Sequence, residues 1–192
     1  MSTQRLKEYC TTLVHLSDEE LEAIDHHFLP KTFKKKEYIL EIGSVCEFVV
    51  FIDQGCVRHF HVKDGDEITC DISLNHIFIT EISSFNAASR SNIAFQAMEE
   101  TRLLMIGKEP LLTLYRRYPT FEELGRKVAE TVAERNAKIA MSLASDKPEA
   151  RYVRLVAERP ETLQRVPQKY IANFLGITPE SLSRIRKRVA TR

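Results

Sequence analysis

The feature that most restricts the fold of this chain is a pair of short amphipathic segments that meet at Gly176. The first, QKYIANFLG, has helical spacing, and four of its residues are expected on its inner side: Ile171, Ala172, Phe174 and Leu175. In the second, GITPESLSRIRKR, Thr178 is suited to cap a helix and Pro179 to begin it, because a first helical residue needs no backbone donor. Two inward apolar faces joined at a glycine turn are typical of a helix-turn-helix.

The second helix has an apolar side and a polar side. Leu182, Ile185 and Val189 share one stripe, and at roughly 100° per residue the opposite side carries charged and hydroxyl groups. Arginine pairs with guanine in the major groove and a carboxylate accepts from the cytosine amino group, so this side predicts contact with double-stranded DNA. An ordinary helical hairpin with a solvated basic tail is the alternative. The predicted DNA contacts are Lys169, Thr178, Glu180, Ser181, Ser183, Arg184, Lys187 and Arg188, and Thr191 shares their side.

The charges of the chain are unevenly distributed. Residues 147–192 contain 11 Lys or Arg and 4 Asp or Glu. Residues 1–146 contain 17 Lys or Arg and 23 Asp or Glu. This asymmetry indicates a polyanionic partner for the C-terminal part alone. No run of about 18 apolar residues or signal segment is recognisable, so we expect a cytoplasmic protein that does not enter a membrane.

Most of the remaining sequence predicts β-structure followed by one long helix. Between Glu37 and Gly107, short runs of β-branched and aromatic residues are separated by Gly43, Gly55 and Gly65, which is typical of an antiparallel sandwich or barrel. From about Pro119 a helix of about 25 residues is expected. Its apolar stripe comprises Leu124, Val128, Val132, Ile139 and Leu143, interrupted by Asn136. The narrow stripe suits a dimer contact; a helix that lies on its own sheet is the alternative.

Together these parts resemble the cyclic-AMP receptor/Fnr (CRP/FNR) family of bacterial transcription regulators, and GITPESLSR is similar to the Fnr-type recognition helix. The resemblance implies an α+β fold: an N-terminal antiparallel β-roll of the jelly-roll, cyclic-nucleotide-binding type (1–118), a dimerisation helix (119–145) and a helix-turn-helix domain (146–192). It also implies a homodimer on palindromic DNA, RNA polymerase as a partner, and Glu180, Ser183 and Arg184 at base edges. The family's β-hairpin wing is expected to be reduced or missing, because the chain stops at Arg192.

The resemblance is weaker at the effector site. Relatives that bind cyclic AMP carry G-x-F-x-G-E-L and then R-[ST]-A, where this chain has HIFITEISSFNAASRSNIAF. Glu81 is retained, but His76 and Thr80 replace the glycines and Ser91 stands at the arginine position, one residue after Arg90. In a strand such a shift turns the side chain to the other face. We therefore expect an unidentified small effector other than cyclic AMP, or none, with these candidate pocket residues: Glu81, Ile82, Ser83, Arg90, Ser91, Asn92 and Asn136.

A metal-dependent, cupin-like function is the alternative from a different class. His59 and His61 are two apart on an expected strand and Glu67 follows a glycine turn, which is similar to the first cupin metal motif. The spacing to Glu67 is longer than usual, and no second histidine motif follows. A surface histidine pair accounts for the pattern more simply, and no G-x-S-x-G, P-loop or G-x-G-x-x-G occurs. We predict no enzyme, metal site or assigned cofactor.

Overall fold

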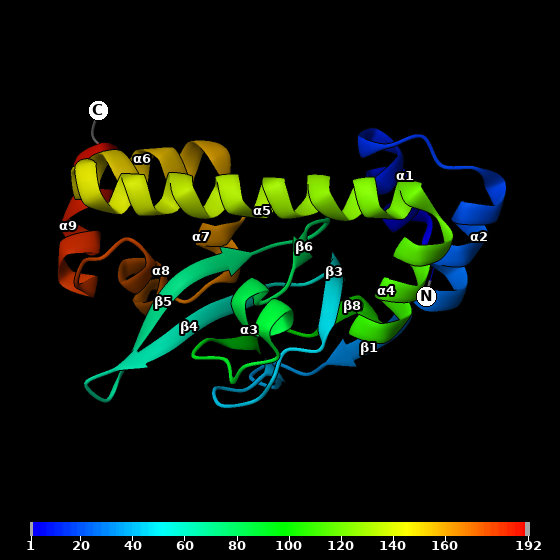
Figure 1. Ribbon diagram of the computed structural model, residues 1–192. Coiled ribbons are helices and arrows are strands. Elements are labelled where there is room, and N and C mark those ends of the chain that lie inside the picture. Colours follow the sequence, from blue (N-terminus) through cyan, green and yellow to red (C-terminus); the bar gives the residue numbers. More distant parts are fainter. Residues whose placement is uncertain (1, 191–192) are drawn as a thin grey trace.

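The computed structural model describes residues 2–190. A β-roll lies beneath one long helix, two helices precede the roll, and the C-terminal helices gather at one end of it (Figure 1). The two N-terminal helices are α1 (Gln4–Leu13) and α2 (Asp18–His27). None of the helices in the described part of the chain combines the length and apolar character that a bilayer span requires.

The roll consists of two antiparallel sheets of four strands each, which confirms the predicted sandwich. The first sheet has the order β1 (Leu29–Phe33), β8 (Thr101–Gly107), β3 (Phe48–Gln54), β6 (Phe78–Ile79). The second has the order β2 (Tyr38–Leu40), β7 (Ala94–Ala97), β4 (Val57–Lys63), β5 (Asp66–Ser73). Buried side chains of both sheets form one core, among them Val50, Ile52, Val57, Phe95 and Leu103.

Gly55 shows why glycine is needed at the end of β3. Its φ is +134°, and a Cβ atom there would lie 2.7 Å from the Cα atom of Thr101. Both the backbone conformation and the close approach of Thr101, at the start of the neighbouring strand β8, therefore require glycine. Gly43 and Gly65, also predicted as turns, have positive φ as well.

Between Leu29 and Tyr118, two short helices and one strand were not predicted. Helix α3 (Ile82–Ala87) lies within the region that the sequence indicated as β-structure, and α4 (Lys108–Arg117) leads from β8 into the long helix. Strand β1 precedes the region in which strands were expected. Glu81 caps the first turn of α3 and holds it helical.

The long helix α5 (Pro119–Ser145) crosses the roll. Of the predicted stripe, Leu124 and Val132 are buried, whereas Leu143 is 42% exposed. The alternative of a helix that lies on its own roll therefore describes the N-terminal half. Further along, the helix leaves the apolar core, and Met141 is 69% exposed.

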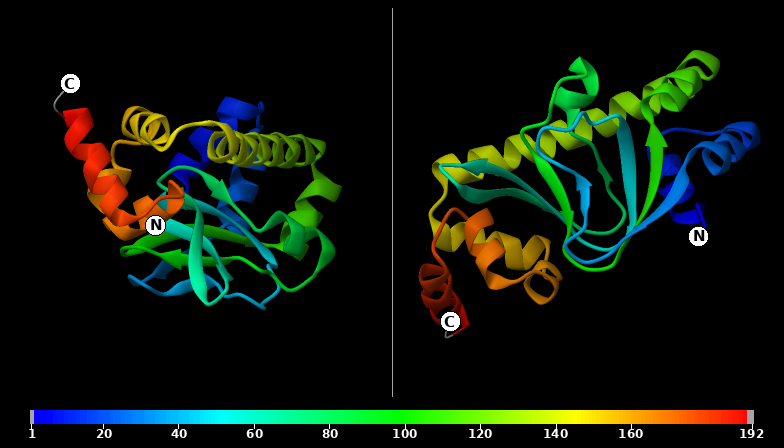
Figure 2. Two further views of the ribbon diagram at one scale, coloured as in Figure 1. Left: turned by 90° about the vertical axis from the view of Figure 1, so that its left-hand side faces the viewer. Right: turned by 90° about the horizontal axis from the view of Figure 1, so that it is seen from below.

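The C-terminal module, residues 146–190, contains four helices. They are α6 (Pro148–Glu158), α7 (Thr162–Arg165), α8 (Gln168–Phe174) and α9 (Pro179–Ala190). The helix break between α5 and α6 falls at the predicted boundary, but one core spans both sides of it. Cys56, Ile72 and Met98 of the roll region belong to the same buried cluster as Tyr152 and Leu155 of α6. Figure 2 shows the module against the end of the roll, with α9 outermost.

Candidate nucleic-acid interface

Helices α8 and α9 form the predicted helix-turn-helix. Gly176 adopts a left-handed conformation with φ +66°, and the Ile177 amide donates to the Ala172 carbonyl at 3.0 Å. Thr178 caps α9: its hydroxyl accepts from the Ser181 amide at 3.3 Å, and its carbonyl accepts from the Leu182 amide at 3.0 Å. A left-handed glycine followed by a hydroxyl cap fixes the angle between the helices.

The two sides of α9 are those predicted. Leu182 and Ile185 are buried, and Val189 packs at the edge of the same core. The polar side is exposed and carries Glu180, Ser183, Arg184, Lys187 and Arg188. Thr191, assigned to this side, lies outside the described residues. The helix therefore docks by its apolar stripe and offers a carboxylate, a hydroxyl and cations to the exterior.

Local interactions keep this polar side charged. The Glu180 carboxyl is bonded to the Glu180 backbone amide and to the Thr178 hydroxyl. These bonds, with a contribution from Arg184, hold its pKa below the ordinary value. Glu180 is consequently an acceptor at neutral pH. The Arg184 guanidinium donates to the Ser181 hydroxyl at 3.2 Å, so Ser181 supports the arginine.

The remaining predicted contacts lie at the ends of the two helices. Arg188 is paired with Glu149 of α6 at 3.0 Å. Lys169 is exposed in the first turn of α8, with its ammonium 4.6 Å from the Tyr170 ring centroid. The eight predicted residues therefore lie on α9, at its cap, or at the start of α8.

The candidate effector residues of the roll are engaged with their own backbone. The Glu81 carboxylate accepts from the amides of Ser83 and Ser84, at 3.3 and 2.6 Å, and so caps α3. Ser91 is buried; its hydroxyl donates to the Ile93 carbonyl at 2.8 Å and accepts from the Ile93 amide at 3.0 Å. The others differ in exposure: Ser83, Arg90, Asn92 and Asn136 are exposed and Ile82 is half-buried.

A cavity of about 550 Å³ lies between the roll, α3, α4 and α5. Ile82 is the one candidate effector residue in its lining, which is mainly apolar and includes Phe85, Tyr115 and Phe121. The Lys108 ammonium donates to the Phe85 carbonyl at the rim. The sequence did not point to this cavity because two of the helices that enclose it were not predicted.

Comparison with known proteins places this arrangement in a known fold. Residues 30–118 match the cyclic nucleotide-binding domain family. No curated protein matches the chain.

FixK2 from Bradyrhizobium japonicum is similar in structure, with a TM-score of 0.70, 18% identity and 85% of each chain covered. The c-di-GMP-responsive regulator CLP of Xanthomonas campestris has a TM-score of 0.71 at 17% identity, with 89% of this chain and 90% of that chain covered. A protein from Eubacterium rectale assigned to the CRP/FNR family of transcriptional regulators has a TM-score of 0.69 at 17% identity, covering 92% and 84%. The chain has the CRP/FNR fold.

The CRP/FNR resemblance stated from the sequence is thus confirmed at the level of the fold, and the cassette can be compared with the chemistry of a cyclic nucleotide. His76, at a glycine position, keeps a left-handed φ of +62°. Thr80, at the other, turns its hydroxyl to the Phe48 carbonyl at 2.9 Å. Ser91 is buried at the arginine position with its hydroxyl bonded to the Ile93 backbone, and Arg90 is exposed. The residues present do not fit a cyclic phosphate, because the position of its cationic partner is taken by a neutral group.

The histidines of β4 do not form the surface pair that the sequence indicated, because His59 is buried and His61 is only partly exposed. His59 is buried with its ring 4.4 Å from that of Phe95, and desolvation lowers its pKa to about 4. Glu67 is instead paired with Arg58 at 2.6 Å. Among residues 2–190 no group of three or more His, Cys, Asp or Glu is placed to hold a metal ion. The geometry gives the cupin-like alternative no support.

Proposed function

We propose that this protein is a transcription regulator that binds double-stranded DNA as a homodimer, with α9 as the recognition helix. The observation that carries the proposal is the division of α9 into a buried stripe and an exposed polar face within a helix-turn-helix. In that motif the second helix enters the major groove and presents its outer side chains to base edges.

The chemistry of the exposed face assigns a role to each part. Arg184 suits bidentate contact with guanine, and Glu180 and Ser183 suit neighbouring base edges. Lys187, Arg188 and Lys169, with the hydroxyls of Thr178 and Ser181, suit phosphate oxygens. Arg188 would exchange its ion pair with Glu149 for a phosphate on binding.

Dimerisation is supported by the outward side of α5. Ala133, Ala137, Ala140, Ala144 and Met141 are exposed there, on the C-terminal half of a 27-residue helix. Small side chains at helical spacing allow a second helix to approach closely, and a two-fold pair would place two recognition helices about one turn of DNA apart. The bound site would then be a palindrome. RNA polymerase is the partner, and the cytoplasm the location, that the CRP/FNR resemblance implies.

The cavity between α3, α4 and α5 is the best-supported position for a small effector other than cyclic AMP. It is mainly apolar, and α5 forms one of its walls. A molecule bound there would act on the helix that leads to the C-terminal module, which is the two-site arrangement that allosteric control needs.

Selection of bound duplexes from a random pool tests the proposal. The purified protein is incubated with the pool, with and without a panel of small molecules that includes cyclic AMP and apolar acids. Enrichment of a palindrome supports a dimeric regulator; a shift with one compound supports the effector. A pool that shows no enrichment under any of these conditions would contradict the proposed function.

A further inference from the structure

The roll holds the C-terminal module at an irregularity in strand β5. His59 pairs with Asp71 and Phe60 with Thr69, so Cys70 is an extra residue that forms a β-bulge. A bulge leaves backbone groups unpaired and redirects the neighbouring side chains. Here the Thr69 amide donates to the side-chain oxygen of Asn173 on α8. The module therefore completes a hydrogen bond that the sheet itself leaves open.

Asp71, at the other side of the bulge, connects three elements. Its carboxylate lies 3.1 Å from the Arg135 guanidinium of α5 and 3.3 Å from that of Arg159, which ends α6. Desolvation by burial acts to raise the pKa of Asp71, but its surroundings, with Arg135 as the largest contribution, hold that pKa below the ordinary value. A buried carboxylate with two cationic partners is expensive to separate from either, because the remaining charges would be left unpaired.

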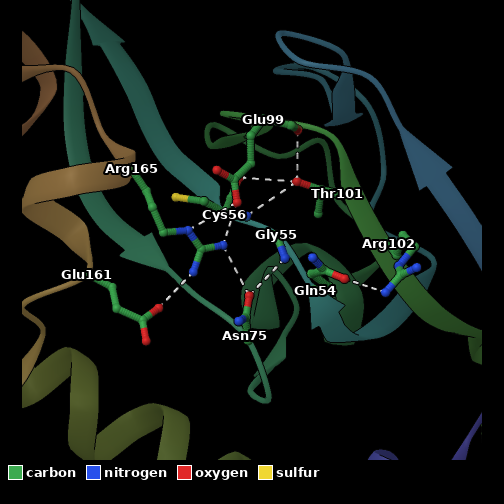
Figure 3. Close-up of polar contacts among 9 residues, drawn as sticks. All are labelled: Gln54, Gly55, Cys56, Asn75, Glu99, Thr101, Arg102, Glu161 and Arg165. Carbon is green, nitrogen blue, oxygen red and sulfur yellow. Dashed lines mark hydrogen bonds and ion pairs between the residues drawn. The ribbon is translucent and has the colours of Figure 1, made fainter.

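A second set of contacts lies at the base of the module (Figure 3). The Arg165 guanidinium of α7 donates to Glu99 at 2.5 and 3.1 Å and to Asn75 at 3.1 Å. The Asn75 oxygen also accepts from the Gly55 amide at 2.8 Å, so this acceptor is fixed to the roll. The planar guanidinium of Arg165 thus binds two residues of the roll, Glu99 and Asn75, at the same time.

A third contact is a stacked arginine. The guanidinium of Arg58 is 1% exposed and lies between Phe60 of its own strand, 4.3 Å from the ring centroid, and Tyr170 of α8, at 4.0 Å. Its nitrogen atoms also donate to Thr69 and Glu67. Because the cation is desolvated, its attraction to the ring of the module is stronger than at an exposed site.

The module contacts the C-terminal half of α5 chiefly near the chain connection, where Arg154 donates to the Ser142 hydroxyl at 3.1 Å. A groove of about 710 Å³ separates that half from α6 and α8, with Lys138, Ile139 and Ser142 on one wall and Leu155 and Phe174 on the other. The contacts that lie away from this connection are those with the roll, through Thr69, Asp71, Asn75, Glu99 and Arg58. In this orientation the polar face of α9 remains exposed.

We infer that the seam formed by Asn75, Glu99 and the β5 bulge on the roll, and by Arg159, Arg165, Tyr170 and Asn173 on the module, determines the spacing between the two DNA half-sites. The inference rests on the proposed function. Two recognition helices reach successive major grooves only at a matching separation. A module fixed to the roll selects one separation, whereas a module held only by the connection from α5 to α6 accommodates several. The seam residues are positioning residues and do not touch DNA.

The test compares spacing preference with base preference. Glu99→Gln and Asn173→Ala, singly and combined, loosen the seam at two separate points and leave α9 unchanged. Glu19→Gln, which removes one partner of an exposed ion pair with Arg117, is the matched control. Affinities are measured for palindromes built from the selected half-site, with the spacer shortened or lengthened by single base pairs. Melting temperatures and amide exchange at Thr69 are measured on the same variants.

The wild type and Glu19→Gln are expected to favour one spacer on the order of tenfold over its neighbours, and the double variant to lower that ratio to a few-fold. The base preference within each half-site should stay the same. Exchange at Thr69 should accelerate in Asn173→Ala. An unchanged spacer ratio in a folded double variant, or unchanged Thr69 exchange, would overturn the inference while leaving DNA binding intact. Failure of the wild type to select a palindrome would instead remove the proposed function, and the inference with it.

Discussion

At the scale of single residues, the candidate interface contains two kinds of side chain: those expected to contact base edges and those expected to contact the phosphate backbone. Arg184 lies at the middle of the exposed face of α9, whereas Lys187 lies one turn further along the same side. A guanidinium that bonds one base edge affects one position of the site. A cation on a phosphate affects all sequences alike.

Arg184→Ala should therefore weaken binding to the selected site by about 1–3 kcal/mol and relax the preference at one base pair in each half-site. Lys187→Ala is the comparison: it should weaken all duplexes similarly and reduce the dependence of affinity on salt concentration. Fluorescence anisotropy on the selected site and on single-base variants distinguishes the two. If Arg184→Ala left the base preference unchanged, its assignment would be wrong.

His59 provides a residue-scale prediction about stability. Burial lowers its pKa from 6.5 to about 4, with Asp71 acting in the opposite direction and Arg135 in the same one. A histidine with a depressed folded-state pKa is neutral in the fold, so its protonation favours the unfolded chain. The free energy of unfolding should fall by up to roughly 3 kcal/mol as the pH is lowered from 6.5 to 4. Urea unfolding of wild type and His59→Leu measures this; equal losses in both would contradict it.

At the scale of elements, the sequence predicted what local chemistry determines. The cap at Thr178, the turn at Gly176 and the inward stripe of α9 depend on neighbours within a few residues, and each is confirmed. The role of the apolar stripe on α5 could not be settled in this way. Its spacing suits a partner helix or a sheet equally well, and in the structure Leu124 and Val128 pack in one core with residues of the roll, while Val132 is buried.

The contacts that join the module to the roll could not be predicted from the sequence, because their partners are far apart along the chain. Thr69 and Asn173 are 104 residues apart, and Glu99 and Arg165 are 66 apart. A carboxylate gives no sign of which arginine it will meet, and the β5 bulge has no glycine to mark it. The helix that carries the candidate DNA contacts could be predicted from local sequence, whereas the contacts that orient it could not.

The outward side of α5 yields an element-scale prediction. Met141→Glu places a charge in the surface proposed to meet a second copy, and in a two-fold pair the two new charges would lie near each other. The dissociation constant of the dimer should rise by roughly tenfold or more. Analytical ultracentrifugation measures it, with Lys35→Gln on an exposed turn of the roll as the control, because it also changes the charge by one negative unit. A dimer equally strong in both variants would place the interface elsewhere.

At the scale of the whole molecule, the predicted domain boundary is a break in the helix but not in the core. Cys56, Ile72 and Met98 are buried together with Tyr152 and Val166 of the module. Separating the module from the roll would expose these apolar side chains on both parts. The two parts are therefore expected to be thermodynamically coupled.

Calorimetry tests that coupling. The full chain should unfold in a single transition whose calorimetric and van't Hoff enthalpies agree. The variant Ile72→Ala, in the roll, should shift the whole transition downward, because it removes a side chain that both parts bury. Two resolved transitions, of which only the earlier or the later moves, would show that the parts unfold independently.

The shared core also bears on genetics. A screen for substitutions that abolish target control is normally interpreted as a map of the surface that reads the promoter. In this protein the same phenotype should arise at Ile72 or Met98, two positions that are buried beneath α6 and α8 and have no access to nucleic acid. Such alleles would indicate that the recognition helix α9 is displaced. A second substitution nearby that refills the lost side-chain volume should restore target control.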